Sequence, residues 1–113
     1  MQVYKLQYIN LPISIRIIHN FAFRAMHQLT EVTLNDNITN IGNSSFADCP
    51  NLKFEYLPES IITIQDFAFQ KAGVKFSSLP DSLREIGMSS FANCSDIDII
   101  DLNNVKTIGA RCF

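Results

Sequence analysis

The stretch that decides the fold is LPESIITIQDFAF at residues 57–69, which returns as LPDSLREIGMSSF at residues 79–91. Both copies begin with Leu-Pro and then carry a Ser, two apolar residues spaced three apart, and a Phe five residues later. A motif that returns at a fixed period is the signature of a repeat architecture. The period is therefore stronger evidence for the fold than any local secondary-structure pattern.

The phenylalanines extend this period through the whole chain. They recur at spacings of 23, 23, 22 and 22 residues: Phe23, Phe46, Phe69, Phe91 and Phe113. With these rings in register, the chain divides into four full units, residues 14–36, 37–59, 60–81 and 82–103, and two partial units, residues 1–13 and 104–113. We therefore expect one repeat array over residues 1–113, because each unit needs its neighbours to bury an apolar face.

Other apolar side chains also recur, and we call a set of equivalent residues a column. The column five residues before the Phe contains only Ile: Ile18, Ile41, Ile64, Ile86 and Ile108. The column three residues after the Phe contains small or flexible side chains: Met26, Cys49, Ala72 and Cys94. We predict that these two columns and the Phe column form the core.

Each unit is predicted to contain two short strands and one helical turn. The first strand is expected at residues 29–34, 52–57 and 97–102, where β-branched and aromatic residues are common. Leu-Pro or a pair of Asn residues then turns the corner into a second strand, such as residues 38–41. The spacing of three between Phe46 and Cys49 indicates a helical turn with both on one face. The expected class is a β-rich α/β solenoid.

Composition narrows the range of functions. The chain is 47% hydrophobic and 18% charged, which favours a packed core, and its net charge of −2 provides no basic field for nucleic acid. No segment approaches the roughly 20 apolar residues that a membrane helix needs, so we expect no membrane insertion.

Candidate catalytic and metal-ligating residues do not form a recognised pattern. Cys49, Cys94 and Cys112 lack metal-ligand spacing, and His19 and His27 have no ligand neighbours, so we expect no metal and no cofactor. The serine pairs beside the Phe column lack a nucleophile motif. We therefore predict that the protein is not an enzyme. Three N-x-S/T triplets, at Asn37, Asn43 and Asn93, are candidate glycan sites or coincidences.

The outer face of the first strand is the candidate binding surface. If Leu29, Val32 and Leu34 set the inward pattern, the residues between them and their equivalents point outward. The outward set is then an aromatic patch with flanking lysines: Tyr8, Phe54, Tyr56, Phe76, Lys53 and Lys75. Such patches mark interaction sites. A shift of one residue would instead turn Phe54 and Phe76 into the core, and both alternatives stay open.

The unit L-x-x-I-x-L-P-x-S-[IL]-x-x-I-G-x-x-x-F-x-x-C resembles the BspA-type leucine-rich repeat. The resemblance is carried by Leu57–Ile61, Leu79–Leu83, Ser45–Cys49 and Ser90–Cys94. It implies a curved leucine-rich-repeat solenoid that binds other proteins. Such proteins are typically surface or secreted adhesins of bacteria and protists, contacting host molecules or neighbouring cells.

Two further expectations follow from the ends of the sequence. No basic and apolar signal pattern is visible after Met1, which favours an intracellular leucine-rich-repeat scaffold as the alternative to an adhesin. The partial units at both ends indicate a longer array, or end-to-end self-association of a short one.

Overall fold

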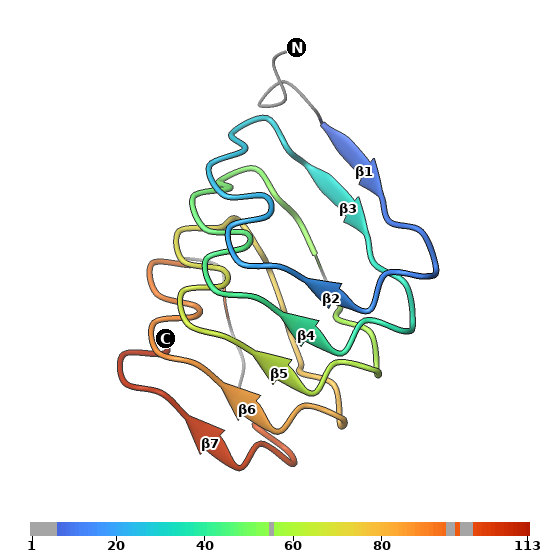
Figure 1. Cartoon of the computed structure of the whole chain (residues 1–113). Coiled ribbons are helices and arrows are strands. Elements are labelled where there is room, and N and C mark those ends of the chain that lie inside the picture. Colours follow the sequence, from blue (N-terminus) through green and yellow to red (C-terminus); the bar gives the residue numbers. More distant parts are fainter. Residues whose placement is uncertain (1–6, 55, 95–96, 98–100) are drawn as a thin grey trace.

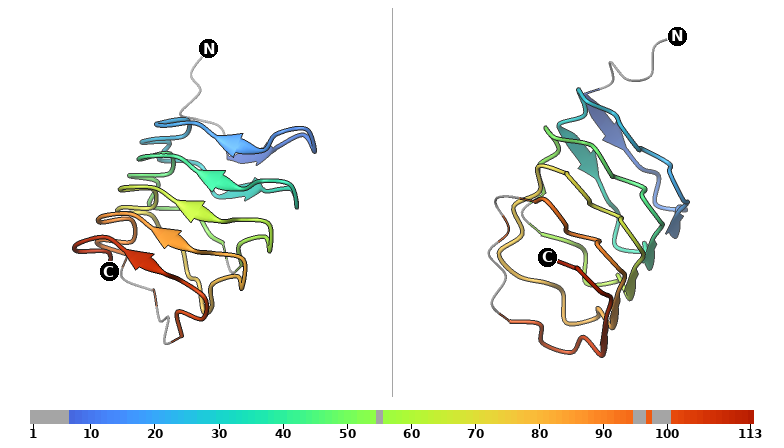
Figure 2. Two further views of the ribbon diagram at one scale, coloured as in Figure 1. Left: turned by 60° about the horizontal axis from the view of Figure 1, so that its bottom comes forward. Right: turned by 90° about the vertical axis from the view of Figure 1, so that its left-hand side faces the viewer.

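The chain coils into a stack of layers that measures 41 × 30 × 21 Å (Figure 1). The computed structural model describes residues 7–54, 56–94, 97 and 101–113. The layers follow the order of the chain, with β1 and β3 at one end of the stack and β7 at the other (Figure 2). The predicted β-rich solenoid is therefore confirmed.

A five-stranded parallel sheet, which we call the long wall, runs along the stack in the order β2-β4-β5-β6-β7. Its strands are β2 (Ile17–Ile18), β4 (Asn40–Ile41), β5 (Thr63–Ile64), β6 (Glu85–Ile86) and β7 (Thr107–Ile108). The Ile column pairs from strand to strand, beginning with Ile18 opposite Ile41. These side chains point inward, because Ile41 and Ile64 are fully buried and their strand neighbours are not.

A second wall contains a shorter parallel sheet of β1 (Tyr8–Asn10) and β3 (Glu31–Thr33). We call this sheet, together with the equivalent segments at residues 52–57 and 74–79, the short wall. Val32 points inward and is 3% exposed, whereas Glu31 and Thr33 point outward. The predicted first strand at residues 29–34 is thus confirmed in its centre.

The described part of the predicted strand at residues 52–57 is not a strand. Leu52, Phe54 and Leu57 are buried, so the two-residue alternation of a strand fails between Phe54 and Leu57. Phe54 is equivalent to the outward-pointing Glu31, and a ladder cannot continue when equivalent residues face opposite sides. The expected strand at residues 97–102 lies largely outside the described residues.

The segment after each long-wall strand is a series of tight turns, and no helix occurs in the described part of the chain. The helical turn predicted there is wrong. Ser44 and Asp48 take left-handed conformations, with φ of 53° and 57°, and the equivalent residues do the same. Alternate amides therefore donate to the next layer at 2.8–2.9 Å: Ser44 to Asp66, Phe46 to Ala68 and Asp48 to Gln70. A helix would direct all of these amides within its own turn.

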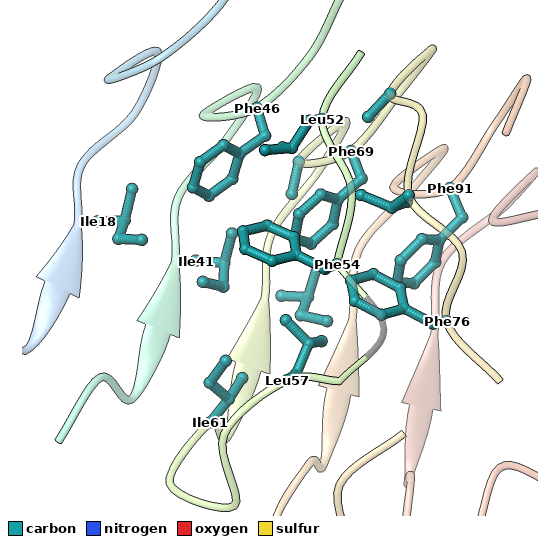
Figure 3. Close-up of a cluster of buried hydrophobic side chains, with 14 of the residues drawn as sticks. Ile18, Ile41, Phe46, Leu52, Phe54, Leu57, Ile61, Phe69, Phe76 and Phe91 are labelled. Carbon is teal, nitrogen blue, oxygen red and sulfur yellow. The ribbon is translucent and has the colours of Figure 1, made fainter. Parts of the chain in front are cut away.

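The core contains two stacks of phenylalanine rings (Figure 3). The predicted Phe column forms the first stack, with ring centroids 5.3–5.6 Å apart. Phe54 and Phe76 form the second, 6.1 Å apart, and meet the first stack edge-on at 5.4–6.2 Å. Edge-on contacts suit the ring quadrupole and stabilise both stacks.

The predicted core is buried in the middle of the stack and open at its ends. Phe46, Phe69 and Phe91 are at most 1% exposed, and Ile41, Ile64 and Ile86 at most 2%. Phe23 and Cys94 are partly buried. Phe113 is 55% exposed, so its placement in the core is wrong: one face stacks on Phe91 and no described layer covers the other.

Candidate functional site

The aromatic patch predicted on the first strand does not form. Phe54 and Phe76 are only 7% and 1% exposed, so their assignment as binding residues is wrong and the one-residue shift is the correct alternative. Tyr8 and Tyr56 remain exposed, at 68% and 70%, and so do Lys53 and Lys75. The two tyrosines lie two layers apart, with the polar residues of β3 between them, and do not form one patch.

The outer face of the long wall presents a continuous surface instead. The inward residue of its strands is always Ile, whereas the outward residue varies: Ile17, Asn40, Thr63, Glu85 and Thr107. A shallow groove of about 580 Å³ crosses β5, β6 and β7 on this face. Thr63, Glu85 and Thr107 line its floor, and Asp66 and Met88 line the side beyond the strand ends. The groove therefore spans three repeats and mixes polar with apolar groups.

A row of side-chain amides and carboxylates borders this groove. Asn20 Oδ1 accepts from the backbone N–H of Asn43 at 2.9 Å, and Asn43 Oδ1 accepts from that of Asp66 at 3.0 Å. Asp66 Oδ1 continues the row to Met88 N–H at 2.8 Å. Sequence reasoning missed this ladder. Its signal is a short side chain with an acceptor oxygen, placed two residues after the inward Ile in three successive units.

The three cysteines are free thiols that pack between layers. Cys49 donates to the carbonyl of Phe23 and Cys94 to that of Phe69, both at 3.0 Å. Burial raises the pKa of Cys49 and of Cys94 to about 11, and it raises the pKa of Cys112 as well. The thiolate is the nucleophilic and metal-binding form, so these groups are poor candidates for either chemistry at neutral pH.

The other candidate side chains do not converge. His19 and His27 are both exposed and lie in different parts of one unit. Among the described residues, no group of three or more His, Cys, Asp or Glu side chains is placed to hold a metal ion. The Asn37 amide donates to the Ile13 carbonyl, whereas Asn93 is exposed. A search of the described residues for a helix long and apolar enough to cross a membrane finds none.

Comparisons with known proteins agree with this architecture. A sequence profile of the BspA-type leucine-rich repeat region matches residues 1–113, in 6 copies. A leucine-rich repeat protein from Bacteroides ovatus is 30% identical with a TM-score of 0.80, over 87% of this chain and 26% of that one. The T. pallidum leucine-rich repeat protein is 28% identical with a TM-score of 0.84, over 96% of this chain and 54% of that one.

The chain thus spans only part of the length of either protein. No curated protein matches it.

Proposed function

Because the chain belongs to the BspA-type leucine-rich repeat family, we propose that it is a non-catalytic module whose protein partner contacts the outer face of the long wall. The observation that supports this proposal is the groove across β5, β6 and β7. There the inward residue of each strand is Ile, whereas the outward residue differs from strand to strand. Repeat arrays use such extended surfaces for recognition. Small-molecule sites, in contrast, are usually deeper and enclose their ligand.

The chemistry of the groove suits a protein surface. Glu85 supplies a charge, the Thr63 and Thr107 hydroxyls can donate and accept hydrogen bonds, and Met88 is 40% exposed. A methionine side chain is flexible and polarizable, so it adapts to irregular apolar partners. A partner would therefore gain polar specificity from the strands and apolar contact from the groove edge.

Within this proposal, the module belongs to an adhesin at a cell surface and contacts host or neighbouring-cell proteins. The family resemblance supports this setting. The alternative is an intracellular scaffold built from the same repeats. A tagged full-length protein in its native cells separates the two: protease added to intact cells removes the tag of a surface protein and leaves that of an intracellular one.

Binding is tested with two charge reversals at equivalent strand positions. The immobilised protein is offered to plasma proteins and, separately, to a cytosolic extract, and each captured protein is then purified and titrated. We expect Glu85→Arg, on the outer face of β6, to weaken affinity about tenfold or more, because it changes the centre of the contact. The control is Glu31→Arg on the outer face of β3, and we expect it to leave affinity within about twofold.

Met88→Ala provides a second probe that carries no charge. We expect it to weaken binding in the same direction as Glu85→Arg. A partner that is lost with Glu31→Arg and retained with both long-wall variants would overturn the proposal.

A further inference from the structure

Three of the five lysines in the chain line one small groove away from the long wall. Lys53, Lys71 and Lys75 surround a hollow of about 240 Å³, together with Pro50, Ala72, Gly73 and Asn93. All three lysines are exposed. The hollow lies where the turn segment is followed by the short wall. None of its lining residues lines the groove across β5, β6 and β7.

The hollow follows from a missing residue. Cys49 and Leu52 are separated by two residues, whereas the equivalent Ala72 and Val74 are separated only by Gly73. All four of these side chains are buried, so the shorter connection cannot bulge outward. Gly73 instead runs close to the layer before it, and its N–H donates to the Cys49 carbonyl at 3.1 Å.

Gly73 also explains why the floor of the hollow stays open. A Cβ on this residue would lie 2.2 Å from the Pro50 carbonyl oxygen, which no side chain tolerates without a shift of backbone. At this connection the layer of residues 60–81 thus lies close to the layer before it. Lysine stems from two layers stand around the recess, with Asn93 of the following layer beside them.

We propose that this basic groove binds an acidic peptide segment of a protein partner. Charge complementarity carries the argument: the chain has a net charge of −2, yet Lys53 and Lys71 bring cationic groups from two layers to this recess. Lysine ammonium groups act as mobile point charges, which suits carboxylates that approach at several angles. The Asn93 side chain adds an amide that can donate to a carboxylate.

The size and the setting favour a peptide over a long polyanion. A recess of about 240 Å³ accommodates one or two carboxylate side chains rather than a polymer. Polyanions such as heparin or nucleic acid are drawn by an extended basic field, and an acidic chain does not provide one. The proposal is independent of the partner contact on the long wall.

The test uses a blocked hexaglutamate peptide titrated into the full chain labelled with ¹⁵N. We expect saturable shifts of the backbone amides around residues 53, 71 and 93, with little change at residues 63, 85 and 107. The affinity should fall as salt rises, because the Debye length shrinks from roughly 10 Å at 0.1 M to about 3 Å at 1 M. Lys53→Gln combined with Lys71→Gln should weaken binding about tenfold.

The matched control is Lys106→Gln, which removes an exposed lysine that does not line the groove. We expect it to change the affinity by less than about twofold. An equal loss with Lys106→Gln, or shifts spread over the whole surface, would show nonspecific attraction and overturn the proposal. So would binding of a heparin oligosaccharide or of inorganic phosphate at these residues without binding of the peptide.

Discussion

The two walls are built from the same repeats, yet among the residues that the structure describes only the long wall has a strand in each of its five layers. On the long wall the inward residue is always Ile, and the strands β2, β4, β5, β6 and β7 pair without a break. On the short wall the inward residue is Val32 in one layer and Phe54 or Phe76 in the next two, shifted by one position. The two described strands of the short wall, β1 and β3, both lie in the layers before that shift.

The difference shows which interaction dominates when packing and pairing conflict. Burying a phenylalanine side chain that would otherwise be exposed to water is worth about 1.5–3 kcal/mol. A backbone hydrogen bond that water can replace contributes only about 0.5–1.5 kcal/mol. The short wall therefore gains more from a second ring stack than it loses from an interrupted ladder.

The largest expected effect comes from removing a ring of that second stack. We expect Phe76→Ala to lower the free energy of unfolding by about 3–5 kcal/mol, because the ring is 1% exposed and contacts Phe54, Phe69 and Phe91. Urea unfolding followed by circular dichroism measures the change. The control is Tyr56→Ala, an aromatic residue of the same wall that is 70% exposed, with an expected change below about 0.5 kcal/mol.

Unchanged stability in Phe76→Ala would contradict the comparison. It would place the ring at the surface, as the sequence alone also allowed, and would return Phe54 and Phe76 to the candidate binding patch.

The second effect tests how the short wall fits a layer that is one residue short. We expect Gly73→Ala to cost about 1–3 kcal/mol, since the new Cβ would meet the Pro50 carbonyl and force the layers apart. Thermal unfolding measures it beside Ser78→Ala, an exposed position in the same wall that should change little. If both variants unfold at the same temperature as the parent, the close approach at Gly73 is not a constraint.

The periodic part of the fold could be predicted from the sequence, because a column of one residue type gives the length of each repeat and the face that points inward. The Phe and Ile columns identify the solenoid and the long wall without any knowledge of contacts. The position of Phe54 could not be decided in this way. The segment from Leu52 to Leu57 fits two inward patterns, and only the contacts of Phe54 with Phe46 in the same layer and with Phe69 in the next layer choose between them.

The turn geometry was also beyond the sequence pattern. A spacing of three between two buried residues fits a helical turn, but it fits the observed turns equally well. Asp is a residue type that takes positive φ more often than most, which fits Asp48, whereas Ser44, Phe21 and Phe67 adopt positive φ without a residue preference that would predict it. Hydrogen bonds to the next layer stabilise that conformation, and such bonds cannot be recognised from the residues of one repeat.

The third effect concerns the long wall and is smaller. Asn43→Ala removes the acceptor of the Asp66 N–H, and we expect a loss of about 1–2 kcal/mol because that partly buried amide loses its partner. Asn40→Ala is the matched control: it lies on the same layer, points outward from β4, and should cost less than about 0.5 kcal/mol. Equal losses in the two variants would show that the side-chain ladder does not reinforce the long wall.

The smallest expected change in stability concerns two buried serines in the turn segments that follow the long-wall strands. Within the described part of the chain, the buried Ser45 hydroxyl has no hydrogen-bond partner, and Ala22 and Ala68 occupy the same column in the adjacent layers. Ser45→Ala should therefore leave stability unchanged or raise it by up to about 1 kcal/mol, since an unpaired buried hydroxyl is costly. Ser90→Ala should instead lose up to about 1 kcal/mol, because the Ser90 hydroxyl lies 3.3 Å from Cys112 Sγ within hydrogen-bond reach.

If the two variants change the free energy of unfolding in opposite directions, the contribution of this column depends on whether its hydroxyl has a hydrogen-bond partner in the next layer. A clear loss in Ser45→Ala would mean instead that its hydroxyl is satisfied in solution. The Ser45 column would then resemble the side-chain ladder beside the long wall, where polar groups link neighbouring layers. It would not resemble the short wall, where phenylalanine rings pack against one another.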